Sequence, residues 1–292
     1  MTTHRPYVPF TLFALLCLAF FPLSAQHLEV GVLGGASNYL GDLSNNSRSI
    51  YIKETNLVGG LFVRYNLHEL VTLRLGANYT SLSGADQNNS DPNLSARNLS
   101  FSSNVIDISV VGEFNILGYQ PYNLYRPFSP YLFAGFGLFT YDPTTIYEGQ
   151  TVKLRPLNTE AQGKADRPSP YGKTAFSIPF GFGLKYALSD KINLGIELGA
   201  RRTTTDYLDD VSTIFVDPLE LSSETAIALS NRSGEIPGSD PSQFTPGMPR
   251  GDDKSHDWFF IAGLTISYNF IDNGLVGSRA RRNKGKKGCR TE

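Results

Sequence analysis

The side chains with the most potential for chemistry form an acidic run in the second half of the chain, consisting of Asp206, Tyr207, Asp209, Asp210 and, a little further on, Asp217. Carboxylate oxygens are the ligands that Ca²⁺ prefers in proteins. A helix–loop–helix calcium loop, however, requires Gly at its sixth position and Glu at its twelfth, and this run has neither. Asp side chains also order loops by accepting hydrogen bonds from backbone amides. We therefore expect no metal here, but turns that order the loop or an external contact.

The second candidate is a cysteine inside a basic segment at the end of the sequence. Residues 271–292 contain two acids, Asp272 and Glu292, and seven bases, namely Arg279, Arg281, Arg282, Lys284, Lys286, Lys287 and Arg290. Cys289 lies among these bases, which favour its thiolate. The segment could dock on an acidic partner, lie on anionic lipid headgroups or stay solvated. The clustered bases beside a cysteine favour partner docking.

Few residues are available for hydrolytic catalysis. A Ser or acid-pair mechanism needs a His or carboxylate base beside a nucleophile. The histidines after His4 are His27, His68 and His256, and His256 precedes Asp257 near the acidic run. An outer-membrane hydrolase is therefore a minor alternative. We expect a protein that is not an enzyme and carries no cofactor.

Eight segments with period-two alternation surround these candidates, and such alternation indicates β-strands. In the last segment, Trp258 and Phe270 end a face of apolar residues whose neighbours are small or polar. Aromatic residues at both ends of an apolar face are typical of a strand that crosses a bilayer. The eight strands are predicted at about 27–36, 55–67, 71–82, 99–116, 130–141, 174–188, 191–202 and 257–270.

The same alternation places charged side chains on the inner faces of the strands. The predicted inward set is Arg64, Arg74, Asp107, Glu113, Lys185, Glu197 and Arg201. Eight strands enclose just enough room for their own side chains. Buried charges are tolerated when they pair, and both signs are present here. We expect a plugged, ion-paired lumen, with an ion or proton conduit as the alternative.

The beginning of the sequence predicts export. His4 and Arg5 are followed by an apolar stretch over 11–21 and by Ala25, which predicts a secretory signal peptide cleaved before Gln26. The stretch is too short for a membrane-spanning helix. Once Cys17 is removed with the signal, Cys289 is the only cysteine, so an intermolecular disulfide and a free thiol are both open.

The connections between the predicted strands alternate between short and long. The long ones, 37–54, 83–98, 142–173 and 203–256, are rich in Ser, Asn, Asp, Gly and Pro. Short periplasmic turns and long external loops are typical of outer-membrane barrels, and an even strand number places both termini in the periplasm. We therefore predict an all-β protein with a signal peptide over 1–25, an eight-stranded outer-membrane barrel over 26–270 and a basic periplasmic tail over 271–292. Its compartment excludes nucleic acid as a partner.

Several stretches resemble the PorG-like outer-membrane barrels of the type IX protein secretion system. Segment 34–43 is similar to the family's opening Tyr-hydrophobic-Gly-Asp-Leu motif, and segment 104–115 to its fourth strand. The most specific similarity is Thr-Asp-Tyr-Leu-Asp-Asp-Val-Ser within 202–213, which Asp217 and Pro218 follow. Segments 228–233 and 257–259 complete a resemblance that covers about 26–270.

The resemblance implies a non-catalytic subunit of an export machine. Such a subunit would anchor or position the periplasmic ring, built from a lipoprotein and its partner, at the outer membrane. It also implies a cysteine on the ring lipoprotein as the partner of Cys289, although the Pro that usually accompanies the family's cysteine is absent from Gly288-Cys289-Arg290. The alternative is a sister barrel that acts as a passive anchor or surface-binding protein.

Overall fold

A computed structural model describes residues 28–44, 52–119, 127–238 and 240–270. The predicted signal peptide and the basic segment 271–292, including Cys289, lie outside the described residues. Within the described part, none of the helices has the length and apolar character needed to cross a membrane.

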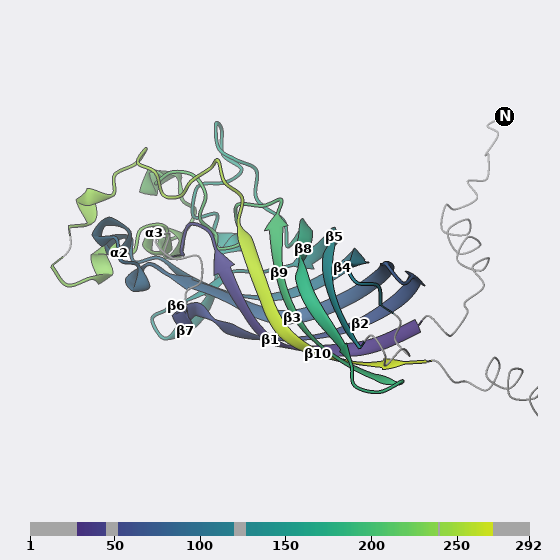
Figure 1. Ribbon diagram of the computed structural model, residues 1–292. Coiled ribbons are helices and arrows are strands. Elements are labelled where there is room, and N and C mark those ends of the chain that lie inside the picture. Colours follow the sequence, from purple (N-terminus) through teal and green to yellow (C-terminus); the bar gives the residue numbers. More distant parts are fainter. Residues whose placement is uncertain (1–27, 45–51, 120–126, 239, 271–292) are drawn as a thin grey trace, which may run out of the picture.

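Eight antiparallel strands close into a barrel (Figure 1). Each strand pairs with the next barrel strand along the chain, and pairing of the first with the last closes the cylinder. The predicted all-β, eight-stranded barrel is confirmed, with each strand within a few residues of its predicted bounds. The strands are β1 (Leu28–Leu40), β2 (Asn56–His68), β3 (Val71–Ala85), β4 (Ser100–Asn115), β5 (Phe128–Thr140), β8 (Thr174–Ala187), β9 (Ile192–Thr203) and β10 (Trp258–Asn269).

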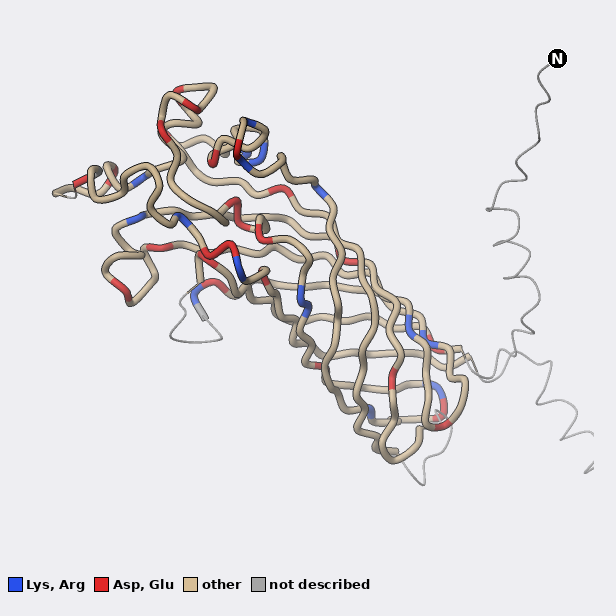
Figure 2. The backbone as a smooth tube through the Cα atoms, turned by 90° about the horizontal axis from the view of Figure 1, so that it is seen from above, with Lys and Arg blue, Asp and Glu red and all other residues tan. Residues whose placement is uncertain are grey.

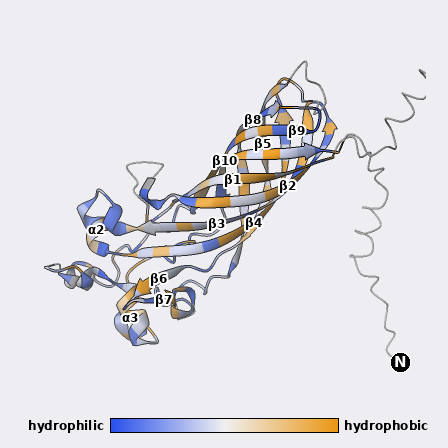
Figure 3. Ribbon diagram, turned by 90° about the horizontal axis from the view of Figure 1, so that it is seen from below, coloured by the Kyte–Doolittle hydropathy of each residue, from blue (hydrophilic) through white to orange (hydrophobic). Residues whose placement is uncertain are grey.

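Alternation along the strands separates an apolar exterior from a polar interior. In β4, Ile106, Ile108 and Val110 are exposed, whereas Asp107 and Ser109 between them are buried. The same pattern repeats around the barrel, whose strands carry orange segments between pale and blue ones in Figure 3. An apolar belt outside fully paired strands meets the two demands of a bilayer, because lipid offers no hydrogen bonds to backbone groups.

The long connections gather at one end of the barrel and fold into a cap (Figure 1). We call this the cap end; β1 begins and β10 finishes at the opposite end, the terminal end. The cap elements are α2 (Pro92–Arg97), α3 (Glu224–Ser230), β6 (Thr144–Tyr147), β7 (Gln150–Lys153) and the short 3-10 turns η2 (Ile52–Glu54), η3 (Asp86–Asn88), η4 (Arg155–Leu157), η5 (Pro218–Glu220), η6 (Ser233–Glu235) and η7 (Pro241–Gln243).

The hairpin of β6 and β7 was not among the predicted strands. Its two-residue turn is Glu148-Gly149, and both residues have positive φ, as a tight hairpin turn requires. Glu148 gives no sequence signal for that conformation. Helix α3, by contrast, follows a recognisable cap, since the Ser223 hydroxyl accepts a hydrogen bond from the Ala226 amide.

One apolar core joins the cap to the barrel. Its barrel members point into the lumen near the cap end and include Val58, Leu82, Val105, Phe139, Phe259 and Ile261. Its cap members include Leu99, Leu154, Leu208, Val211 and Leu229. Burying a large apolar side chain contributes about 1.5–3 kcal/mol. Because this burial is shared between strands and connections, the cap packs directly on the end of the barrel.

Candidate functional site

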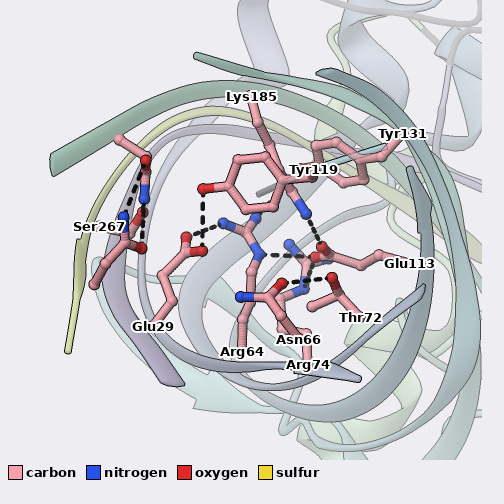
Figure 4. Close-up of polar contacts among 12 residues, drawn as sticks. Glu29, Arg64, Asn66, Thr72, Arg74, Glu113, Tyr119, Tyr131, Lys185 and Ser267 are labelled. Carbon is pink, nitrogen blue, oxygen red and sulfur yellow. Dashed lines mark hydrogen bonds and ion pairs between the residues drawn. The ribbon is translucent and has the colours of Figure 1, made fainter. Parts of the chain in front are cut away.

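Three cations converge on Glu113 in the half of the lumen nearer the terminal end (Figure 4). Glu113 Oε1 lies 2.9 Å from Arg64 Nε and 3.1 Å from Arg74 Nε, and Glu113 Oε2 lies 2.5 Å from Lys185 Nζ. The four side chains come from four different strands, and all of them are buried. Glu113 therefore ties β4 to β2, β3 and β8 across the lumen.

Two further carboxylates complete the cluster. Glu29 Oε1 lies 2.7 Å from Arg64 Nη1, and Glu197 forms an ion pair with Arg74. The Tyr131 hydroxyl donates to Glu197 Oε2 at 2.7 Å. Charge-assisted hydrogen bonds of this kind are roughly twice as strong as neutral ones. We call Glu29, Arg64, Arg74, Glu113, Lys185 and Glu197 the lumen charge network.

Aromatic rings fill the space around these cations. The guanidinium of Arg64 lies 4.3 Å from the centre of the Phe62 ring, and that of Arg74 lies 4.9 Å from the Phe133 ring. Lys185 Nζ is 4.6 Å from the ring centres of both Tyr119 and Tyr131. Cation–π contacts are worth more when the cation is desolvated, as it is here.

A separate ion pair lies nearer the cap end than the lumen charge network. It joins Arg201 Nε to Asp107 Oδ2 at 3.5 Å. Asn78 Nδ2 also donates to Asp107 Oδ2 at 3.1 Å. With this pair, four cations face four carboxylates in the described lumen, so the described charges balance. Such a lumen is a polar core that holds the wall together, and the predicted pairing of the lumen charges is what the structure shows.

The wild-type protein is expected to show no ion conductance in planar lipid bilayers. The lumen charge network and the apolar core near the cap end lie one after the other along the lumen, and a barrel of eight strands has an interior just wide enough for its own side chains. Single-channel recording of the reconstituted protein tests this, with a porin reconstituted in the same way as the positive control. Reproducible conductance steps from a preparation free of porins would contradict a plugged lumen.

Every charge that the sequence places in the lumen is found there, and Figure 2 shows both signs along the barrel strands. Glu29 and Tyr131 were missed, although alternation within β1 and β5 points them inward. Tyr119 could not be found that way, because it follows the end of β4 and returns into the lumen, where its hydroxyl donates to Glu29 Oε2 at 3.3 Å. No periodic signal marks such a turn.

Most of the acidic run lies inside the cap, and the carboxylates of Asp209 and Asp217 accept hydrogen bonds from backbone amides of the same connection. Asp209 and Asp210 are fully buried and Asp206 is 9% exposed, because the cap folds back over them. Asp217 lies apart from them and accepts a hydrogen bond from the Leu219 amide at 2.9 Å, at the start of η5. Within the described residues, no group of three or more His, Cys, Asp or Glu side chains is arranged to hold a metal ion.

Asp210 belongs to a second ion-pair centre, inside the cap. Arg250 Nη1 lies 2.8 Å from Glu160 Oε1 and donates to the Asp210 carbonyl oxygen at 2.7 Å. Glu160 also accepts hydrogen bonds from the Ser212 and Thr213 amides. Burial raises the pKa of Asp210 to about 6, although the positive charge of Arg250 opposes the rise.

No sequence signal marks Arg250 or Glu160, because both lie in irregular connections without periodicity. His256 is the histidine that the sequence offers as a candidate catalytic base near the acidic run. It is exposed, whereas its neighbour Asp257 is buried. The basic residues of 271–292 and Cys289 cannot be placed, since they lie outside the described residues.

A closed barrel of eight antiparallel strands, apolar outside and ion-paired within, defines the class of outer-membrane β-barrel proteins. Within that class, the chain belongs to the family described as "Domain of unknown function (DUF6089)", whose family model matches residues 9–218. No curated protein sequence matches the chain.

The chain is similar to several solved outer-membrane barrels over most of its length. The N-terminal β-barrel domain of Pseudomonas aeruginosa OprF is 13% identical, with coverage of 83% of this chain and 97% of that one and a TM-score of 0.34. Neisserial surface protein A is 8% identical, with coverage of 83% and 96% and a TM-score of 0.40. Pseudomonas aeruginosa OprG is 11% identical, with coverage of 84% and 97% and a TM-score of 0.36.

Proposed function

We propose that this protein is a non-catalytic outer-membrane barrel subunit of a type IX protein secretion apparatus, where it anchors or positions the periplasmic ring complex. The observation that carries the proposal is the ion-paired lumen, because a barrel whose interior is occupied by its own side chains is expected to act through its surfaces. The resemblance of 34–43 and 202–213 to PorG-like barrels supplies the particular machine.

The basic segment 271–292 is the proposed docking element. It follows β10, which finishes at the terminal end of the barrel, so the segment starts on the side opposite the cap. On the proposed orientation this side faces the periplasm and both termini lie there. Its seven bases would meet an acidic surface of the ring lipoprotein or of the lipoprotein's partner, with outer-membrane lipids around the barrel.

Cys289 is expected to form a disulfide with the ring lipoprotein. A non-reducing gel of native envelopes, probed for this protein, should show a larger species in the wild type that disappears with reductant and in Cys289→Ser. Mass spectrometry then identifies the partner. A single monomer band in both strains would remove the covalent link and leave a non-covalent anchor.

Deleting 271–292 tests whether the whole basic segment is needed for docking. The described barrel finishes before this segment, so the truncated protein should still fold and migrate as a heat-modifiable species. Co-purification of the ring components should fall at least about tenfold, as expected when several charge contacts are lost together. Unchanged co-purification would exclude the segment as the docking element.

The alternative, a passive anchor or surface-binding barrel, is favoured by one observation. The connections at the cap end are ordered by a shared apolar core and by buried ion pairs, as in a preformed binding surface. Deletion of 271–292 separates the two functions. It abolishes association with the ring in the first case and leaves any surface attachment intact in the second.

A further inference from the structure

Three sequence stretches that the proposed function leaves unexplained meet at the junction of cap and barrel. Tyr39 is the last residue but one of β1, Asp209 belongs to the acidic run, and Asp257 immediately precedes β10. All three side chains are buried, at 2%, 0% and 1% exposure. Tyr39 Oη lies 2.7 Å from Asp209 Oδ2 and 2.9 Å from Asp257 Oδ1.

These two distances require an additional proton. A tyrosine hydroxyl has one proton, so it can donate to only one of the two carboxyl oxygens. The outer oxygens are already occupied: Asp209 Oδ1 accepts from the Val211 amide at 2.9 Å, and Asp257 Oδ2 accepts from the Leu208 amide at 3.0 Å. Asp209 Oδ2 and Asp257 Oδ1 both face Tyr39 Oη, and the tyrosine donates to one of them. The other can lie this close only if its own carboxyl is protonated and donates to Tyr39 Oη.

The packing leaves no room to relax this arrangement. A Cβ atom added at Gly41 would lie 1.9 Å from Asp257 Oδ1 and 2.1 Å from Tyr39 Oη. Glycine is therefore required two residues after Tyr39, because any side chain would displace the carboxyl from the hydroxyl. The Tyr-x-Gly spacing near the start of the barrel thus has a direct structural reason.

A second observation, independent of this hydrogen-bonding pattern, also points to bound protons. Asp206 is 9% exposed, and neither of its carboxyl oxygens makes a hydrogen bond of normal geometry within the described part of the chain, although the Ser212 hydroxyl faces it; Asp42 Oδ2 likewise has no such partner there. Burying an ionised carboxylate without a partner is costly, and such a group takes up a proton instead.

Few positive charges are available to hold these carboxyls ionised. Asp42, Asp206, Asp209 and Asp257 form no ion pair within the described residues, and the nearby Arg97 forms a bidentate pair with Asp86. Arg97 donates to the Asp42 carbonyl oxygen at 2.8 Å. The titratable or charged groups that face the cluster from the surrounding described elements are Tyr39, Arg97, Tyr141, Glu160, Tyr171 and Asp252.

We infer that the junction is a proton-binding lock, in which a shared proton among Asp209, Tyr39 and Asp257 fastens the cap to the barrel and its loss at rising pH releases the cap. The lock has strands β1 and β10 on one side and the connection after β9 on the other. Releasing it frees the last long connection of the cap without changing the pairing of the barrel strands.

The pH range follows from the direction of the shifts. Burial raises the pKa of Asp42 to about 7 and that of Asp206 to about 8, and burial with neighbouring carboxylates raises the pKa of Asp209 and Asp257 well above the ordinary value. An acid whose pKa is raised in the closed state stabilises that state fully below its ordinary pKa of about 4. For Asp42 and Asp206 this stabilisation is lost as the pH rises towards 7–8, and for Asp209 and Asp257 it is lost progressively as the pH rises above that ordinary value.

Hydrogen exchange of the full-length protein in lipid nanodiscs tests the lock. The protection factors of amides in 206–212, corrected for the intrinsic exchange rate, should fall at least about tenfold in the wild type between pH 5 and pH 7, since each released proton contributes up to tenfold per pH unit. In Asp257→Asn the amide nitrogen replaces the proton as donor to Tyr39. The protection factors of 206–212 in this variant should stay high at pH 7. Their pH dependence should be weaker than in the wild type by about tenfold per pH unit.

Asp209→Asn is the second variant and should behave in the same way, so a folding defect in one variant does not decide the outcome. Asp253→Asn, at an exposed position of the same connection, is the control and should keep the wild-type profile. Heat-modifiable migration verifies that each barrel is folded. Equal wild-type protection at pH 5 and pH 7, or a wild-type pH profile in both folded Asn variants, would overturn the inference.

Discussion

Glu113→Gln is expected to destabilise the barrel by about 3–5 kcal/mol, the usual cost of removing one partner from a buried ion pair. The amide keeps the volume but removes the charge on which Arg64, Arg74 and Lys185 converge. Glu29 and Glu197 then remain as the only carboxylates for three buried cations in the lumen charge network. Urea unfolding in lipid vesicles, followed by the fluorescence of the single tryptophan, Trp258, measures the loss.

Glu235→Gln is the matched control for this substitution. Glu235 pairs with Arg232 at 2.8 Å, but its side chain is 38% exposed, so its removal should cost no more than about 1 kcal/mol. Losses of similar size in the two variants would mean that burial does not govern the strength of the lumen charge network. A folded Glu113→Gln protein with unchanged stability would contradict the structure directly.

Arg250→Met is expected to unfold the cap locally while the barrel stays intact. The substitution keeps an apolar stem but leaves Glu160, which is fully buried, without its cation, again at a cost of about 3–5 kcal/mol. Arg250 also donates to the carbonyl oxygens of Ser230 and Asp210, so two segments of the last connection lose an anchor. Hydrogen exchange and limited proteolysis over 206–256 should show the loss of protection.

Arg155→Met tests whether any cap arginine has this effect. Arg155 pairs with Asp142 at 3.6 Å and its side chain is 30% exposed, so its loss should change protection by no more than about fivefold. Heat-modifiable migration should be unchanged in both variants. A barrel that also unfolds in Arg250→Met would show that cap and barrel form one cooperative unit.

The strands could be predicted because a bilayer outside and a small lumen inside impose period two on every residue of the wall. Ile106, Asp107 and Ile108 illustrate this, since each one faces the environment that its chemistry demands. The predicted ends of the strands were less accurate where a strand packs against the cap. Tyr39 lies beyond the predicted first strand because its contacts are with Asp209 and Asp257, which are distant in sequence.

The interior site could be predicted only in part, for the same reason. Arg64 and Glu113 follow from alternation, but which cation pairs with which carboxylate depends on the register between strands, which composition does not encode. The burial of Asp210 was missed because an acidic run in a polar connection normally faces water. Its environment is created by Arg250, Thr159 and Tyr171, which the sequence places far away.

The seam of the barrel also constrains how the protein assembles. Strand β1 pairs with β10, so the first and last strands must meet, as in Glu29 opposite Asn269, before the wall is complete. Contacts of such sequence separation form slowly, because a long loop must close before they contribute. Until then, two unpaired edges are open to other chains. A helper that shields these edges would therefore bind β1 or β10, and truncation within 258–269 should cause aggregation rather than a smaller barrel.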